Sequence, residues 1–459
     1  MTVVTLSVPM GNGATDHLRA LVGQFLALER DVIVLSLAML AFSLAFQMTS
    51  RFVPEYMQVL GAGAGAIGLY GSLGNLIGAT YPYPGGAFSD RVGSRAALTA
   101  FGLASTVGFV VWYFAEAFGV VVFGPFPLPT IELAGFRIGG VTDPLLLPVG
   151  IFLGLLLTQA WKSFGLGATF AIVKQATDSS SLATGFASTE TFRRVGFLLG
   201  PLLATAILAG AAFSTGFRTV LLVAAAFAAV GTLTQHVLYD ASEDSIGKSV
   251  EGVSTVLADL RSLPGPLRPL LVADTLVRFA NGMVYVFFVI VVTRFLGVGF
   301  ELGGVRLSPA AFFGLLLTVE MVVALLTMLP VARLADAYGL KPVVALGFSV
   351  YATFPALLIL SPADQWVLIA LFAFSGLRFA GLPAHKALIV GPASAGTGGR
   401  VTGTYYLVRN TVVIPSAALG GWLYDSDPVL AFGVAAAVGV LGTGYFLLFG
   451  RDIEAHRAD

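Results

Sequence analysis

Long apolar stretches separated by short polar ones run through almost the whole sequence. A helix needs about 20 mainly apolar residues to cross the hydrocarbon core of a bilayer, and backbone groups in lipid must pair within their own segment. The stretches do not alternate between apolar and polar residues as barrel strands do. We therefore predict twelve transmembrane helices, over residues 32–58, 65–85, 96–118, 145–173, 184–209, 217–239, 269–295, 310–331, 343–361, 366–390, 402–422 and 429–450.

The longest polar interruption, from Tyr239 to Pro269, divides these helices into two groups of six. It carries eight charged residues, and residues 249–260 within it can form a helix on the membrane surface. The pattern predicts an all-α membrane protein with two pseudo-symmetric six-helix bundles. Its expected parts are a cytoplasmic N-terminal segment (1–31), the N-terminal bundle (32–239), a cytoplasmic linker (240–268), the C-terminal bundle (269–450) and a cytoplasmic tail (451–459).

The composition supports a membrane protein: 57% of the residues are hydrophobic, 11% are charged and the mean hydropathy is +0.89. An average soluble domain has about 25% charged residues, so we expect the lipid bilayer to surround this chain. The net charge of zero suggests no nucleic-acid partner. The chain has no cysteine and only four scattered histidines, and no nucleophile–base, metal or phosphate-loop constellation occurs. We therefore predict neither an enzyme nor a cofactor or metal site.

The basic residues are distributed unevenly between the polar segments. If the N-terminus is cytoplasmic, thirteen Lys and Arg residues lie in inside segments and four in outside segments. Because positive residues favour the cytoplasmic side, we predict a multi-pass protein of the plasma (inner) membrane with both termini inside. The first 30 residues lack a basic segment followed by an apolar core, so no cleaved signal peptide is expected.

Two of the predicted outside loops contain paired glycines. Residues 123–144 include Gly139 and Gly140, and residues 297–309 include Gly303 and Gly304. We predict a short glycine-turned hairpin in each loop. Such hairpins either simply connect two helices or form a gate over a substrate path.

A short charged turn follows the second predicted helix. Residues 90–95 read Asp-Arg-Val-Gly-Ser-Arg, and residues 331–341 contain a degenerate copy. The aspartate and the glycine of one copy each lie 246 positions from those of the other. The turn resembles the cytoplasmic loop signature of the major facilitator superfamily. Two copies at a constant offset, each between apolar stretches, indicate a duplicated architecture.

The twelve predicted helices, the two turns and the central linker cover essentially the whole chain, which is similar to a secondary transporter of that superfamily. In such transporters the loop residues form cytoplasmic contacts that break as the two halves rock between inward-open and outward-open states. The resemblance also implies that helices one, four, seven and ten line a central cavity. It assigns a gating role to Asp90, Arg91, Gly93, Arg95 and Asp336.

The fifth predicted helix contains Gly196-Phe-Leu-Leu-Gly200-Pro201. This stretch is similar to the Gly-x-x-x-Gly-Pro element of the superfamily's antiporters, although Ala204 and Thr205 stand where further glycines are usual. It therefore favours an exporter. Its glycines also allow close helix packing, and its proline kinks the helix.

A second internal repeat joins the fourth and tenth predicted helices. Gly165 aligns with Gly381 at an offset of 216, and the same offset places Lys162 on Arg378. Parallel repeats with a site near the bilayer midplane are a common design of transporters.

Charged residues within the predicted helices are the main functional candidates, because each costs roughly 2.5–3.5 kcal/mol at the bilayer centre by insertion scales. Helical spacing predicts three local groups: Arg51 with Glu55, Asp274 with Arg278, and Glu190 with Arg193 and Arg194. Lys162, Arg378, Arg409 and Glu320 have no opposite charge within one turn of their own helices.

These charges allow two interpretations. A surplus of cations binds an anionic substrate, since arginine forks suit carboxylate or phosphate, or Lys162 or Arg378 pairs with Glu320 or Glu190 across helices and leaves no anion site. Glu320 and Glu190 are likewise either proton-coupling groups, because a desolvated carboxylate favours its protonated form, or salt-bridge partners. The substrate-binding candidates are Arg51, Lys162, Arg278, Arg378 and Arg409, with Asn281 and Asn75.

The main hypothesis is a monomeric secondary active transporter that moves a small anionic solute by alternating access, with proton coupling or exchange. One rival is a multidrug/H+ antiporter that exports apolar or cationic compounds. Another is a transport-inactive membrane sensor or assembly protein, which predicts a sealed centre with every charge paired.

Overall fold

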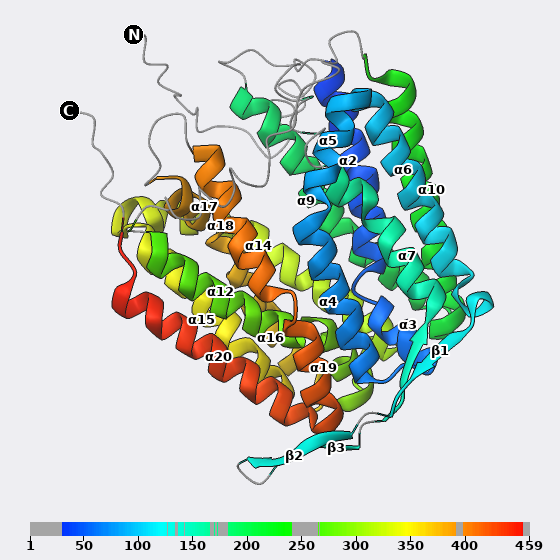
Figure 1. Cartoon of the computed structure of the whole chain (residues 1–459), viewed down its shortest axis with the longest axis vertical. Helices are drawn as coiled ribbons and strands as arrows, with labels where there is room; N and C mark the ends of the chain where they lie inside the picture. The colour runs from blue at the N-terminus through cyan, green and yellow to red at the C-terminus, as the bar shows by residue number, and fades with distance from the viewer. Residues whose placement is uncertain are drawn as a thin grey trace.

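The computed structural model describes residues 30–125, 127–133, 136–141, 143–165, 169, 172, 182–240, 265, 267–391 and 398–452. Helices in this part of the chain form two bundles that stand beside each other (Figure 1). The predicted surface helix at 249–260 lies outside the described residues.

The first bundle contains a series of helices, several of which are interrupted within one predicted crossing. They are α2 (Arg30–Thr49), α3 (Val53–Val59), α4 (Ala64–Thr80), α5 (Pro82–Val92), α6 (Ser94–Tyr113), the 3-10 helix η1 (Ala115–Phe118), α7 (Val149–Gln159), the π-helix η2 (Ala160–Phe164), α9 (Leu182–Leu208) and α10 (Phe213–Leu238).

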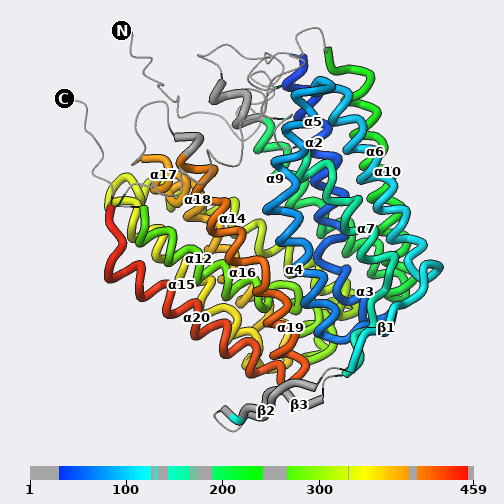
Figure 2. The backbone as a smooth tube through the Cα atoms, in the orientation of Figure 1, coloured from blue at the N-terminus to red at the C-terminus, as the bar shows by residue number. Residues whose placement is uncertain are grey.

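The second bundle begins with a helix that changes geometry three times along its length. This helix is α12 (Leu267–Val284), continued by the 3-10 helix η3 (Tyr285–Phe287), by α13 (Phe288–Ile290) and by the π-helix η4 (Val291–Phe295). The others are α14 (Pro309–Tyr338), α15 (Leu340–Ile359), α16 (Gln365–Ala380), α17 (Leu382–Val390), α18 (Gly398–Val413), α19 (Ser416–Ser426) and α20 (Pro428–Phe449). Figure 2 shows the path of the backbone through both bundles.

The predicted helical membrane class is confirmed. Nine helices in the described residues are long and apolar enough to cross a bilayer. The remaining predicted segments are 65–85, 145–173 and 402–422, and each also contains helix but in shorter pieces. Proline ends two of these pieces, because Pro82 follows α4 and Pro415 separates α18 from α19. The count of twelve crossings therefore stays a prediction.

The stretch at 196–201 packs α9 against α2. A side chain at Gly196 would collide with Ser43, and one at Gly200 would lie 2.6 Å from the Cβ of Gln47. Pro201 lies inside α9, and its carbonyl accepts a hydrogen bond from the Thr205 hydroxyl. The glycines therefore permit the close helix contact that the sequence predicts.

The two charged turns have the same backbone geometry. Gly93 ends α5 and precedes α6 with φ 88° and ψ 155°, and Gly339 ends α14 and precedes α15 with φ 93° and ψ 168°. Glycine adopts this left-handed region at little cost. The second repeat also matches, because Gly165 follows η2 with ψ −8° and Gly381 follows α16 with ψ 0°. Both offsets found in the sequence therefore mark equivalent structural positions.

Short antiparallel strands gather at one end of the molecule (Figure 1). They form three pairs: β1 (Val120–Phe123) with β4 (Leu145–Pro148), β2 (Pro127–Leu133) with β3 (Phe136–Val141), and β5 (Phe300–Leu302) with β6 (Val305–Leu307). Gly303 and Gly304 form the β5–β6 turn with φ 59° and 84°. The predicted glycine-turned hairpin in 297–309 is confirmed. The loop 123–144 also forms a hairpin, but Gly139 and Gly140 lie within β3 and not at its turn. A gating role for either hairpin stays a prediction.

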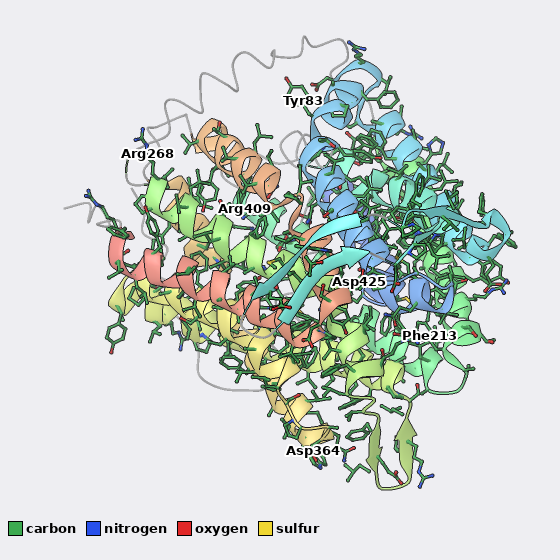
Figure 3. All side chains as sticks on the ribbon, turned by 60° about the horizontal axis from the view of Figure 1, so that its bottom comes forward. Tyr83, Phe213, Arg268, Asp364, Arg409 and Asp425 are labelled. Carbon is green, nitrogen blue, oxygen red and sulfur yellow. The ribbon has the colours of Figure 1, made fainter. Side chains whose placement is uncertain are left out.

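Hydrogen bonds join the two bundles near this strand end. Asp425, in the last turn of α19, accepts hydrogen bonds from the backbone N–H groups of Ala64 (3.0 Å) and Gly65 (2.8 Å) at the start of α4 (Figure 3). Glu55 of α3 pairs with Arg294 of η4 at 3.0 Å. In addition, α4 packs against α19 and α9 packs against α14. These contacts hold the two bundles together at the strand end, which is closed.

We expect Asp425→Ala to open this end. The substitution leaves two N–H groups of α4 without their acceptor, and an ordinary hydrogen bond contributes about 0.5–1.5 kcal/mol. Because the sequence has no cysteine, spin labels can be attached at Val121→Cys and Leu302→Cys, which are exposed on strands of opposite bundles. Double electron–electron resonance should then show that the population with a long distance between the two labels is about 10-fold larger than in the wild type.

Asp364→Ala is the matched control. Asp364 accepts hydrogen bonds from Trp366 and Val367 at the start of α16, so it caps a helix within one bundle. Its loss should leave the distance distribution unchanged. An unchanged distribution in Asp425→Ala would contradict the assigned role of Asp425.

The same labels test a dependence on pH. Asp425 lies beyond the predicted crossing at 402–422. Burial raises the pKa of its carboxyl, the hydrogen bonds from Gly65 and Ala64 lower it, and Asp143 raises it, with a net upward direction. The carboxyl therefore binds its proton more tightly in the closed state than in water, so lowering the pH should favour closure of the strand end. Asp425→Asn should abolish this effect.

Candidate functional site

Two adjoining cavities lie between the bundles. One, here called the Arg51 cavity, has a volume of about 160 Å³, and the other, here called the Asn281 cavity, has a volume of about 260 Å³. Tyr285 lines both. It is the first residue of η3, where α12 changes to a 3-10 helix, so a helix break places this ring between the cavities.

The Asn281 cavity is lined by polar side chains from both bundles. Asn75 comes from α4, Arg278 and Asn281 from α12, and Arg409 and Asn410 from α18. Four of the predicted substrate-binding residues therefore come together here: Asn75, Arg278, Asn281 and Arg409. The Nδ2 group of Asn75 donates a hydrogen bond to the carbonyl of Val413 at 3.3 Å. The Oδ1 atom of Asn75 can still accept a hydrogen bond from a bound molecule.

A single carboxylate, Asp274, supports both arginines of this cavity. Its side chain is fully buried. It lies 3.3 Å from Nε of Arg278 and 3.1 Å from Nη1 of Arg409, and it accepts a hydrogen bond from the Tyr405 hydroxyl at 3.1 Å. His385 Nε2 is 3.4 Å away. The predicted pair of Asp274 and Arg278 is confirmed, and Arg409 has a partner on another helix that spacing along its own helix does not reveal.

A buried ion pair adjoins the Arg51 cavity, because its carboxylate, Glu320, is one of the lining residues. Nη2 of Arg378 on α16 is 2.6 Å from Oε1 of Glu320 on α14, and the same oxygen accepts from the Ser375 hydroxyl at 2.5 Å. Both charged side chains are almost fully buried. Aromatic rings surround the guanidinium, including Phe379 at 4.7 Å and Tyr351 at 5.2 Å. For Glu320 and Arg378, the alternative of a pair across helices is therefore correct.

Arg51 has no comparable partner. Its guanidinium lies 3.7 Å above the Tyr285 ring, it is buried, and its Nη2 atom makes no hydrogen bond. The predicted pair of Arg51 with Glu55 is wrong, because α2 ends at Thr49 and α3 begins at Val53. The two residues therefore do not share one continuous helix face, and Glu55 instead contacts Arg294.

Of the remaining candidates, the Glu190 group lines the Arg51 cavity and Lys162 does not. Glu190 pairs with Arg193 at 2.7 Å and Arg194 at 3.1 Å, as predicted, and all three line this cavity. Lys162 lies in η2 with its amino group 5.8 Å from the Phe46 ring. Neither Lys162 nor Arg378 lines the Arg51 or Asn281 cavity.

The predicted gating residues lie at the opposite end from the strands. Asp90 and Arg91 are near the end of α5, and Asp336 is near the end of α14. Nε of Arg95 donates to the carbonyl of His236 at 2.7 Å within the first bundle. Gly93 provides the turn between α5 and α6, as described above. No hydrogen bond between described residues links Asp90 or Arg91 to the other bundle.

Sequence reasoning missed two residues that shape the cavities. Tyr285 looks like an ordinary aromatic residue of an apolar helix, and only the helix break places it between the cavities. Asn410 follows Arg409 directly, and its Oδ1 atom accepts hydrogen bonds from that guanidinium at 3.2 and 2.9 Å. The adjacency of a polar residue to an intramembrane arginine was the available signal.

No family model matches the sequence. A curated relative, an uncharacterized MFS-type transporter of Methanocaldococcus jannaschii, is 22% identical over 92% of this chain and 95% of its own length. The solved nucleoside transporter NupG has a TM-score of 0.69 at 14% identity, covering 92% of this chain and all of that one. A POT family transporter in complex with a thioalcohol-conjugated peptide also gives 0.69, at 12% identity and with 93% and 99% covered.

The chain forms two helical bundles with polar cavities between them, and the similar proteins are named as transporters. The solved structures establish the fold, and the curated relative adds a similarity over almost the full sequence. The chain is therefore similar over almost its full length to an MFS-type transporter, and it has the fold of the solved transporters.

Glu320→Ala should destabilise the protein strongly. It leaves the Arg378 guanidinium buried without its carboxylate, which costs about 3–5 kcal/mol. Thermal unfolding in detergent should therefore show a clearly lower midpoint. The double variant Glu320→Ala with Arg378→Leu should recover part of the loss, because it removes the unpaired charge.

Glu301→Ala is the control for this measurement. Glu301 pairs with Arg306 at 2.7 Å on the exposed β5–β6 hairpin, and exposed pairs contribute at most about 1 kcal/mol. Equal midpoints for Glu320→Ala and Glu301→Ala would contradict the proposed importance of the buried pair.

Proposed function

We propose that this transporter moves a small anionic solute by alternating access and that the solute binds in the two cavities. The surplus of positive charge at this depth is the observation that supports the proposal. Three carboxylates, Glu190, Asp274 and Glu320, face a larger set of cations. The seven cations are Arg51, Lys162, Arg193, Arg194, Arg278, Arg378 and Arg409.

The surplus is costly unless an anion offsets it. Charges interact strongly where the surroundings are apolar, and a buried guanidinium with an unused donor favours a carboxylate or phosphate oxygen. Arg51 is such a group, since its Nη2 atom is buried without a hydrogen bond. Asn75 and Asn281 supply neutral hydrogen-bonding groups in the adjoining cavity.

Solved transporters of similar fold include complexes with molecules that carry acidic groups. Solved POT structures include complexes with sulfate and with 5-aminolevulinic acid. At 12–15% identity these likenesses concern the fold, so the substrate of this chain is inferred from its own cavities.

Glu320 is the proposed proton-coupling group, with Glu190 as a second candidate. While ionised, Glu320 neutralises Arg378 and also lies near Arg51, whose charge interacts with it. A proton on Glu320 removes this internal counter-ion, and the substrate anion then replaces it. Binding of the solute and binding of the proton therefore support each other.

The closed strand end fits one state of an alternating-access cycle. In our proposal this end faces outward, both termini are cytoplasmic and the protein resides in the plasma membrane. Asp90, Arg91, Gly93, Arg95 and Asp336 act at the inner end, where the contacts of Asp90 and Arg91 with the other bundle form only after the inner side closes. The open cavities argue against a sealed, transport-inactive protein, and their charged lining argues against apolar drugs.

An anion screen on the purified protein tests the proposed substrate class. We expect small organic anions to raise the thermal unfolding midpoint, whereas cationic and apolar drugs should not. Arg409→Gln should weaken anion binding about 10-fold or more, because one charge-assisted hydrogen bond contributes about 1.5–3 kcal/mol. Stabilisation by cationic or apolar drugs alone would favour the multidrug alternative.

Proton coupling is tested in liposomes with an imposed pH gradient. The gradient should drive solute accumulation by the wild type and not by Glu320→Gln, which keeps an oxygen acceptor for Arg378 but binds no proton. Solute exchange without a gradient should continue in this variant. Glu301→Gln, on the exposed hairpin, should behave as wild type, and full gradient-driven uptake by Glu320→Gln would contradict the assignment.

A further inference from the structure

The positive surplus is divided between the two cavities. Around the Arg51 cavity, four guanidinium groups share two carboxylates: Arg193 and Arg194 contact Glu190, Arg378 contacts Glu320, and Arg51 contacts neither. In the Asn281 cavity, Arg278 and Arg409 share Asp274. Each cavity therefore retains positive charge after every described ion pair is counted.

The two charged ends share an aromatic ring. The Tyr285 ring lines both cavities, and Arg51 lies 3.7 Å above it. A spacer that joins an acidic group in one cavity to an acidic group in the other would therefore pass this ring.

Unused hydrogen-bonding groups occur at both ends. At one end, Nη2 of Arg51 is buried and has no acceptor. At the other end, the side chain of Asn281 lines the cavity and makes no hydrogen bond within the described residues. The hydrogen bonds given by Arg409 go to Asp274 and to its neighbour Asn410. An anion at either end would gain a charge-assisted contact.

We infer that the substrate is an organic dianion with two acidic groups joined by a short spacer. One acidic group binds Arg51, the other binds near Arg278 and Arg409, and the spacer passes Tyr285. This inference rests on the proposed function and narrows it from anions in general to dianions. A monoanion would fill one end and leave the surplus charge of the other without a counter-ion.

The volumes of the two cavities limit the size of this dianion. A water molecule occupies roughly 30 Å³ of the liquid, and a dicarboxylate of four to six carbons displaces about four to six waters. Cavities of about 160 and 260 Å³ hold such a molecule with part of its hydration. Linear diacids in this range are therefore suitable probes.

Calorimetric titration of the purified full-length protein tests the inference with matched pairs. The pairs are succinate with butyrate, glutarate with valerate, and adipate with hexanoate, which differ in one carboxylate at equal chain length. We expect at least one diacid to bind about 10- to 100-fold more tightly than its monoacid, which corresponds to one charge-assisted contact.

Two variants assign the ends. Arg51→Gln and Arg409→Gln should each reduce the affinity for the diacid to about that of the monoacid, and Arg51→Lys should retain part of the preference. Arg306→Gln is the matched control, because Arg306 lies on the exposed β5–β6 hairpin and pairs with Glu301. It should leave the preference unchanged. If Arg51→Gln does not fold, the loss or retention of the diacid preference in Arg409→Gln decides whether the two cavities bind the diacid.

The possible failures are distinguishable. If monoacids bind as tightly as diacids, the dianion is excluded while the transport of anions stands. If a preference for diacids survives in both Arg51→Gln and Arg409→Gln, the assignment to the two cavities is wrong. If none of the diacids or monoacids binds and the wider anion screen is also negative, the proposed function itself fails.

Discussion

The compensation of buried charge governs the centre of this protein. Moving an ion from water into an apolar bundle carries a large desolvation cost, which a well-placed partner offsets only in part. The Asp274 carboxylate forms ion pairs with two arginines and accepts a hydrogen bond from a tyrosine hydroxyl, which offsets part of this cost. Glu320 meets it with Arg378 and Ser375. Among the described residues around the cavities, the carboxylates are fewer than the cations, and the anion that we propose as substrate would offset the remaining positive charge.

Sequence reasoning succeeded where the physical signal is local. Apolar length revealed the helices, and the paired glycines Gly303 and Gly304 revealed the β5–β6 turn. The constant offset of Gly93 and Gly339 revealed two turns with nearly the same dihedral angles. Ion pairs on one continuous helix were also predictable, as Asp274 with Arg278 and Glu190 with Arg193 demonstrate.

It failed where the outcome depends on packing between helices. The partner of Glu320 is 58 positions away and that of Arg409 is 135 positions away, so spacing along one helix carries no information about either. The expected pair of Arg51 and Glu55 failed because the chain leaves the helix between them. Tyr285 was missed because a change to 3-10 geometry in an apolar helix has no clear sequence signature.

The close approach of α4 and α19 has a mechanical consequence. Backbone touches backbone there, because a Cβ atom at Gly68 would strike the carbonyl of Ala417 and one at Gly421 would meet that of Ala64. Two helices in direct backbone contact can rotate relative to each other at the crossing without rearranging side chains between them. A small rotation at this crossing therefore moves the far ends of the two bundles, where α5 and α17 lie, by a larger distance.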